Sequence, residues 1–250
     1  MDLSSFAPVA IVLDFASSLV SALADLLTPL AGGLSTAAAI VAITVLVRAA
    51  LIPVGRSQVR AEFTRRRLAP KLQELQRRYK NNPELLQRKT MELYAAEKAT
   101  PLAGCLPTLL QAPVLSTVYS LFILQGINGR PNGLLTEDVF GVPLGMPLLG
   151  FVGQGAVWPG LLVYIVLLIV IAGVAWLSRR AAVRNAPVTP DSVPPVMQNL
   201  TGVLSWMPFV TVIFAGIVPL AATLYLAVTT TWTLVERAVL RRRFAARLVE

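Results

Sequence analysis

The feature that most constrains this chain is an apolar stretch, Ser35 to Val54, that carries one arginine. A helix of about 20 apolar residues, rising 1.5 Å per residue, crosses a hydrocarbon core of roughly 30 Å. A charge inside such a helix costs about 2.5 kcal/mol or more, and the charge here is Arg48. It lies six residues before Val54, about 9 Å from that end. Two interpretations are therefore open: the guanidinium snorkels to the headgroups, or it serves a function inside a watery cavity.

Composition places the whole chain in the membrane-protein class. Hydrophobic residues make up 55% of the 250 residues and charged residues 14%, against about 25% charged residues in typical soluble chains. The only cysteine is Cys105, which excludes an intrachain disulfide. Histidine is absent, which excludes histidine-based triads, HExxH zinc sites and histidine proton relays. We therefore expect an all-α polytopic membrane protein.

The one long polar segment, residues 55–99, holds twelve Lys and Arg against five Glu. Most of its residues favour helix, and Asn81-Asn82-Pro83-Glu84 is typical of a helix stop followed by a restart. Asn82 is the expected N-cap, with Pro83 at the first helical position and Glu84 in the first turn. The pattern predicts helices over 57–79 and 83–98 that fold back as an antiparallel hairpin. The alternative is that the charge run is only a solvated, positive-inside face.

Further apolar stretches predict four more spanning helices. Residues 100–124 contain Pro107 and Pro113, which predict kinks, and residues 157–177 form a third span. Residues 198–240 would make one helix of roughly 64 Å, about twice the bilayer core. This stretch must therefore fold back, and Ala215-Gly216-Ile217-Val218-Pro219 is the predicted corner.

The N-terminal stretch 9–27 is amphipathic. Asp14, Ser18 and Asp25 recur near helical spacing and leave an apolar side opposite them. This pattern favours a helix that lies in the membrane interface. The alternative is a first spanning helix, which would move only the N-terminus to the other side.

Basic residues are distributed very unevenly between the two sides of the membrane. Twelve lie in the hairpin, three in the 178–197 loop and five in the C-terminal end counted from Arg237, which is 20 of the 22. The positive-inside rule places these segments in the cytoplasm and the N-terminus outside. The expected segments are an extracytoplasmic N-terminus 1–33, spans 34–54, 100–124, 157–177, 198–216 and 218–239, the cytoplasmic hairpin 55–99, an extracytoplasmic loop 125–156, a cytoplasmic loop 178–197 and a basic cytoplasmic tail 240–250.

The polar residues of the spans are expected to be neutral apart from Arg48. The sequence interpretation assigns no Asp, Glu or Lys to the interior of a span, which argues against intramembrane aspartyl proteases, Ser-Lys dyads and carboxylate-coupled transport. No GxxxxGK[ST] nucleotide motif occurs. We therefore expect no enzyme, no cofactor and no metal. Candidates to line a polar cavity with Arg48 are Thr44, Thr108, Gln111 and Tyr225, although a membrane Thr often only bonds its own i−4 carbonyl.

Four motifs occur in one order along the chain. They are the span TVLVRAALIPVGRSQ, the hairpin KLQELQRRYKNNPELLQRKTMELYAAEKATP, the segment AGCLPTLLQAPVLSTVYSLF and the pair WMPFVTVIFAGIVPLAATLYLAVTTTWTLVE. Together they resemble the YidC/Oxa/Alb superfamily of membrane protein insertases. The absence of a large extracytoplasmic domain resembles the short form found in Gram-positive bacteria. Two departures from the pattern are Leu226, where the family often has Trp, and Thr230, where many members have Asn.

The resemblance implies five transmembrane helices around a hydrophilic groove that opens to cytoplasm and lipid, in a bacterial plasma membrane. Arg48 matches the groove arginine, which attracts acidic or polar parts of an incoming chain, while the hairpin recruits substrate. The implied partners are nascent membrane-protein chains and the lipid bilayer, with the ribosome and the Sec translocon as further candidates and no DNA. Two alternatives stay open at this point. One is a small channel or transporter, and the other is a structural scaffold with the hairpin as a docking site.

Overall fold

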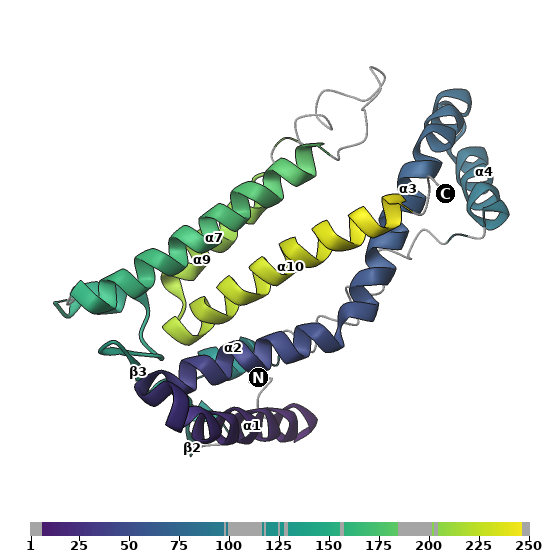
Figure 1. Cartoon of the computed structure of the whole chain (residues 1–250). Helices are drawn as coiled ribbons and strands as arrows, with labels where there is room; N and C mark the ends of the chain where they lie inside the picture. Colours follow the sequence, from purple (N-terminus) through teal and green to yellow (C-terminus); the bar gives the residue numbers. More distant parts are fainter. Residues whose placement is uncertain are drawn as a thin grey trace.

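Long helices follow one another along the chain of the computed structural model, which describes residues 7–97, 99, 117, 119–124, 126–127, 130–155, 158–184, 202 and 205–246. They run side by side except where α3 carries a hairpin away from the rest (Figure 1). The helices are α1 Ala7–Ala31, α2 Ser35–Ala50, α3 Ile52–Arg78, α4 Pro83–Ala96, α6 Leu148–Gly153, α7 Trp158–Arg184, α9 Met207–Ile217 and α10 Leu220–Ala246.

Helix α1 turns back into α2 through the short 3-10 helix η2, Gly32–Leu34, where Gly32 has a φ of +54°. Glycine adopts this left-handed conformation without the Cβ clash that other residues meet. Leu13 and Val20 of α1 are fully buried, in one apolar core with Ala39 and Ile40 of α2. The turn therefore allows the two apolar helices to pack against each other.

Helices α2 and α3 are separated only by Leu51. Its N–H still bonds Val47 O at 3.1 Å, and Pro53 in the first turn of α3 has no N–H to donate. The break directs α3 out of the helix bundle, and the hairpin of α3 and α4 projects from one end (Figure 1). Helix α3 therefore starts at Ile52, earlier than the predicted residue 57, because Pro53 favours the first turn of a helix.

The predicted restart of the hairpin is confirmed. The side-chain oxygen of Asn82 accepts a hydrogen bond from Leu85 N at 3.0 Å, Pro83 is the first residue of α4, and Glu84 lies in its first turn. This is an ordinary N-cap, which stabilises a helix by about 1 kcal/mol. Helix α4 packs back on α3, as the short link requires.

The predicted corner between the last two apolar helices is also present. Helix α9 ends at Ile217 and Val218 is extended, after which α10 begins. The Thr223 hydroxyl spans the corner by donating to Ala215 O at 2.7 Å. Leu220 N and Ala221 N, at the start of α10, donate to Met146 O and Leu144 O at 3.0 and 2.9 Å. Loop 130–147 therefore fixes the start of α10.

That loop contains structure that the all-α expectation did not include. Two short antiparallel ribbons form between β1 Gly126–Ile127 and β2 Arg130–Pro131, and between β3 Asp138–Val139 and β4 Val142–Pro143, with η3 Gly133–Leu135 between them. The turn from β3 to β4 uses Phe140 and Gly141, both at positive φ. The ribbons are too short for hydropathy patterns to reveal, because two residues carry no period. All other regular structure in the part of the chain that the structure describes is helical, apart from one isolated bridge between Pro147 and Pro219.

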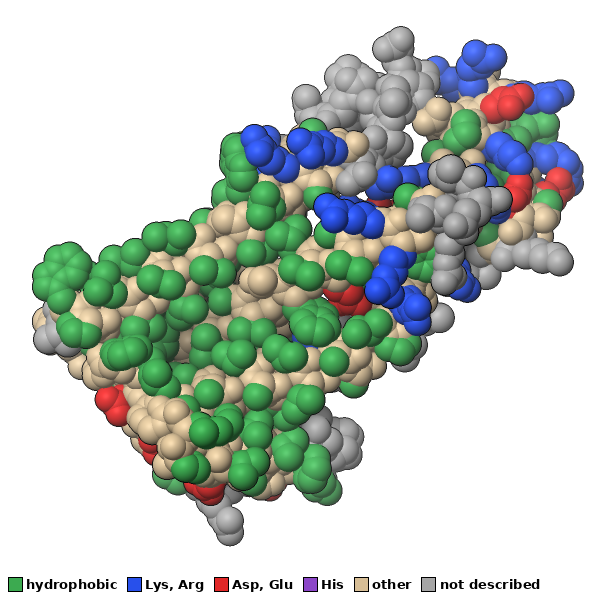
Figure 2. All heavy atoms as spheres, in the orientation of Figure 1, with side chains coloured by type: hydrophobic (Ala, Val, Ile, Leu, Met, Phe, Trp, Pro, Cys, Tyr) green, Lys and Arg blue, Asp and Glu red, His purple; other side chains and the backbone are tan. Residues whose placement is uncertain are grey.

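Among the described residues, two helical stretches are long and apolar enough to cross a membrane, namely Leu13–Ala50, which includes the turn at η2, and Trp158–Arg184. Met207–Ile217 is a shorter apolar helix. Of the predicted span 100–124, only 117 and 119–124 are described, so Pro107 and Pro113 lie outside the described residues. Figure 2 shows hydrophobic side chains over most of the visible face, whereas Lys and Arg gather at the end with the hairpin.

Asn132 is the polar residue on which this loop depends. It is 4% exposed, donates to Leu121 O and Leu124 O at 2.8 and 2.9 Å, and accepts from Leu134 N. We predict that Asn132→Ala destabilises the protein by about 1–3 kcal/mol, because it leaves buried carbonyls unsatisfied. Thermal unfolding in nanodiscs measures the loss. Asn81→Ala, at the exposed link of the hairpin, is the control, and equal melting curves for the two variants would contradict the prediction.

Candidate functional site

Arg48 lies in the last turn of α2 and faces α10. It is 8% exposed, and its Nε donates a hydrogen bond to Thr229 Oγ1 at 3.0 Å. Its terminal nitrogens make no hydrogen bond to any residue that the structure describes. A snorkelling arginine would extend away from its helix to the surface. This guanidinium instead points into the contact between two apolar helices. Most of its N–H donors have no acceptor among the residues that the structure describes.

The other predicted site residues have different surroundings. Thr44 is 1% exposed, and its hydroxyl donates to Ile40 O, its own i−4 carbonyl, at 2.6 Å. This is the ordinary behaviour of a membrane Thr, so Thr44 packs one turn from Arg48 without a free polar group. Thr108 and Gln111 lie outside the described residues.

Tyr225 is brought to the site as expected. It is 4% exposed and lies one turn before Thr229 on α10, close enough to Arg48 for an electrostatic interaction. Its ring packs against Tyr119 and Phe122, with centroid distances of 6.2 and 5.9 Å. Arg48 and Tyr225 are therefore neighbours, and two aromatic rings from the end of the second apolar segment pack against Tyr225.

Sequence reasoning singled out Thr230 on α10, but Thr229 is the residue that contacts Arg48. The Thr230 hydroxyl donates to Leu226 O in its own helix at 2.7 Å. Tyr225, Thr229, Thr233 and Glu236 recur at spacings of four, four and three residues, which places them on one helical face. That spacing could have identified Thr229 from the sequence alone.

Glu236 overturns one expectation from the sequence. It lies inside the predicted span 218–239, in the continuous helix α10, so the statement that no span contains a carboxylate is wrong. Its Oε2 accepts a hydrogen bond from Trp232 Nε1 at 2.9 Å. Its Oε1 is buried and has no hydrogen-bond partner among the described residues. Arg48 thus has an acidic neighbour, although the two do not come within ion-pair distance.

Arg48 and Glu236 line the same small cavity, of about 30 Å³, which has room for a single water. Its walls come from α2, α3 and α10 and from Leu51 between α2 and α3. They consist of Arg48, Leu51, Gly55, Gln58, Thr233, Glu236, Arg237 and Leu240.

A larger apolar cavity of about 370 Å³ adjoins this small cavity and shares Glu236 and Leu240 with it. Its other walls are Ile52, Arg56, Trp232, Val235, Val239 and Arg243. Glu236 therefore stands between a polar and an apolar space.

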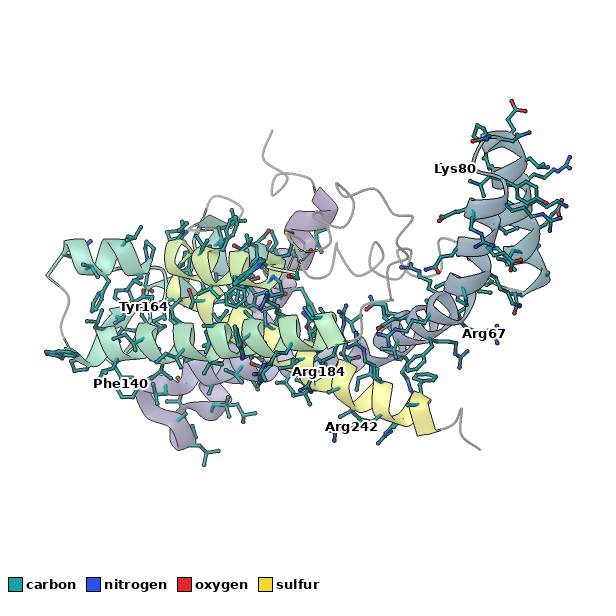
Figure 3. The ribbon with its side chains drawn as sticks, turned by 90° about the horizontal axis from the view of Figure 1, so that it is seen from above. Arg67, Lys80, Phe140, Tyr164, Arg184 and Arg242 are labelled. Carbon is teal, nitrogen blue, oxygen red and sulfur yellow. The ribbon has the colours of Figure 1, made fainter. Side chains whose placement is uncertain are left out.

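The hairpin carries the second concentration of charge. In Figure 3, Arg67 of α3 and Lys80 of the link between α3 and α4 lie on the projecting hairpin, far from Phe140 at the opposite end of the molecule. Glu97, just after α4, pairs across the hairpin with Lys71 and, at 3.0 Å, with Arg67 of α3. The hydrogen bond from Lys71, with its charge and that of Arg67, lowers the pKa of the Glu97 carboxyl.

Comparison with known proteins gives a consistent result. The sequence profile of the family described as 60Kd inner membrane protein matches residues 27–247. The ALBINO3 inner membrane protein of Arabidopsis thaliana chloroplasts is 32% identical over 205 residues, which is 75% of this chain and 42% of that protein. The membrane protein insertase YidC of Clostridium perfringens is 39% identical over 90 residues, 34% of this chain and 38% of that protein. The matches thus span less than half the length of these relatives.

The hydrogen bond between Arg48 and Thr229 generates a stability prediction. Thr229→Val keeps the shape of the side chain but removes the acceptor of a buried charged donor, so we expect a loss of about 1–3 kcal/mol. Thr230→Val is the matched control, because its hydroxyl serves only its own helix. Thermal unfolding in nanodiscs compares the two. A Thr230→Val variant that melts as early as Thr229→Val would show that the bond contributes nothing specific.

The ion pairs of Glu97 with Lys71 and Arg67 generate a pH prediction. A carboxyl with a lowered pKa stabilises the closed hairpin above the ordinary Glu range, and this contribution is lost as the pH falls through the lowered pKa. We expect Glu97→Gln to loosen the contact between α3 and α4 slightly at neutral pH, because exposed ion pairs contribute little to stability, and acidification of the wild type to have the same small effect. Spin-label distances between the two helices measure this. Glu74→Gln, at an exposed position of α3, should change nothing.

Proposed function

The chain belongs to the 60Kd inner membrane protein family, that of the YidC, Oxa and Alb proteins, and on this basis we propose that it is a membrane protein insertase and chaperone. The observation that carries the proposal is the buried Arg48. It faces the polar stripe of α10, formed by Tyr225, Thr229, Thr233 and Glu236, within an otherwise apolar bundle. In this proposal the chain binds polar or acidic parts of a nascent membrane protein and releases its apolar helix into lipid.

The physical argument concerns the cost of moving a polar segment through hydrocarbon. A fixed guanidinium with unused donors attracts a carboxylate more strongly in a partly buried site than in water, because the effective dielectric constant is lower. A polar space that reaches from the cytoplasm to Arg48 shortens the apolar distance that the segment must then cross. In this proposal α2 and α10 line the groove, and the predicted span 100–124, to which Thr108 and Gln111 belong, is expected to complete it.

The proposed topology has five spans, with the hairpin and the C-terminus in the cytoplasm and the N-terminus outside. Its support is the gathering of Lys and Arg at one end of the molecule, which agrees with the positive-inside rule. In Figure 3 the labelled Arg67 and Lys80 lie at that end, and Arg184 and Arg242 lie near the middle of the molecule, at the ends of α7 and α10 that are nearer the hairpin. The membrane is the bacterial plasma membrane.

We assign α1 to the membrane interface on the extracytoplasmic side. One of its faces packs on the protein, and the rest of its surface divides into an apolar and a polar stripe at helical spacing. The exposed apolar stripe consists of Ile11, Phe15, Leu19, Leu26 and Leu30. The exposed polar stripe consists of Asp14, Ser18, Ser21 and Asp25. A helix lying flat between lipid and water requires these two stripes, whereas a spanning helix has no use for the polar one.

The hairpin is the proposed recruiting element, because its basic surface projects into the cytoplasm. Nascent chains are its proposed partners, with the ribosome contacted through the same surface and the basic tail. Solute or ion flux through purified protein in liposomes without a nascent chain would favour a channel or transporter instead.

The central test replaces Arg48. We predict that Arg48→Ala lowers the insertion of substrates with acidic extracytoplasmic tails about tenfold, equivalent to ~1.4 kcal/mol, while Arg48→Lys largely keeps it. Site-specific crosslinking to stalled ribosome–nascent chains and protease protection of the inserted tail measure the effect. Arg184→Ala removes an exposed cation at the end of α7 and is the control. Unchanged insertion of several acidic-tailed substrates by Arg48→Ala would refute the electrostatic mechanism.

A further inference from the structure

Glu236 has no role in the proposed function so far, although it shares the cavity of Arg48. Its carboxylate is held in place from one side by Trp232, whose indole N–H donates to Oε2 at 2.9 Å. The other oxygen, Oε1, is buried and unpaired among the described residues. Leaving a buried carboxylate oxygen unpaired is unfavourable, so such a group calls for an explanation.

Gly55 of α3 makes room for this carboxylate. A Cβ atom added at residue 55 would overlap the Glu236 side chain, so any residue other than glycine would displace it. Helix α3 and helix α10 meet at this point, and the cavity lies between them. The position of Glu236 therefore depends on two features that are far apart in the sequence, an indole donor on α10 and a missing side chain on α3.

The charges that Glu236 meets are cationic. Arg48 and Arg237 line the same cavity and interact with it electrostatically, without an ion pair inside 4.0 Å. Glu236 consequently weakens the positive field of Arg48 but does not occupy the guanidinium donors. An acidic group that binds Arg48 has to approach a second carboxylate as well, and like charges at short range repel.

We infer that Glu236 is a specificity-determining residue of the groove: it competes with acidic segments for the field of Arg48 and so limits how strongly they are held. Its free Oε1 offers an acceptor to amide, hydroxyl or ammonium donors of the same segment. With Glu236 present, the affinity of the groove for acidic tails exceeds its affinity for other tails by a smaller factor than it would with an arginine alone. An acidic segment is therefore released more readily. This inference rests on the proposed function, since it concerns the same site.

The test compares peptides that differ only in the charge of one tail. Three fluorescent peptides with an identical apolar segment and an acidic, a neutral or a basic tail are titrated onto the purified full-length protein in nanodiscs. We expect Glu236→Gln, which keeps the acceptor for Trp232, to tighten binding of the acidic peptide about five- to tenfold. The neutral peptide should change little and the basic peptide should bind more weakly. Glu236→Asp, which retains the charge, should keep the order of affinities of the wild type.

Glu236 acts mainly by changing how strongly acidic segments bind Arg48. A double variant tests this dependence. In an Arg48→Gln background, adding Glu236→Gln should change the ratio of acidic to neutral peptide affinity by clearly less than it does in the wild-type background, since only the direct repulsion is left. Gly55→Ala, which displaces Glu236 without removing it, is the second variant, and it should shift the same ratio in wild-type background. A thermal melt of each variant establishes that it is folded.

The outcomes separate the two proposals. If Arg48→Gln weakens the acidic peptide but neither Glu236→Gln nor Gly55→Ala changes the ratio of acidic to neutral affinity, the role of Glu236 is refuted and the insertase mechanism stands. If Glu236→Gln changed the affinities of the three peptides by the same factor, Glu236 would have only a packing role, and the inference would be refuted. If Arg48→Gln leaves the acidic peptide unaffected, the electrostatic mechanism itself fails.

Discussion

The structure depends on the way one buried cation is accommodated between two apolar helices. Arg48 cannot lose its charge, so its surroundings must supply compensation in a region of low dielectric constant. Thr229 accepts from its Nε, and Glu236 contributes an opposite charge from two turns further along α10. Both compensating groups lie on α10, so the charge links α2 to α10. An apolar residue at position 48 would pack these helices at least as well, which is why the arginine points to function.

Helix α10 is the element that connects the parts of the molecule. At its start, Leu220 and Ala221 bond loop 130–147, and in its middle Thr229 meets Arg48. Near its end, Arg241 pairs with Glu62 of α3 at 3.0 Å, and Glu62 also pairs with Arg66. The Phe63 and Phe244 rings pack beside this pair, 6.1 Å between centroids. The hairpin that leaves the bundle at Leu51 is thus held at its base by the same helix that carries the polar stripe.

Much of the fold could be predicted because its signals are local. The apolar lengths, the N-cap at Asn82 and the corner before Pro219 each depend on a few adjacent residues, and each has a known geometric consequence. The ribbons of loop 126–143 could not be predicted, because two-residue strands have no period and their partners are chosen by tertiary contacts. In the site, Arg48 stood out by its charge in an apolar stretch and Tyr225 by the family resemblance, whereas Thr229 was missed although it lies four residues after Tyr225 on the same helical face.

The failure to predict Glu236 has a physical cause. The predicted span 218–239 includes Glu236, but hydropathy gives weight only to the apolar residues of a span, so a carboxylate followed by Arg237 and three consecutive arginines was not considered as part of its interior. Helix α10 in fact runs without a break to Ala246, and its periodicity rather than its hydropathy decides which side chains face inward. Glu236 continues the inward face of Tyr225, Thr229 and Thr233, while Arg242 and Arg243 lie exposed. At the edge of a membrane, a charged residue on the inward face of a continuous helix belongs to the site that this face lines.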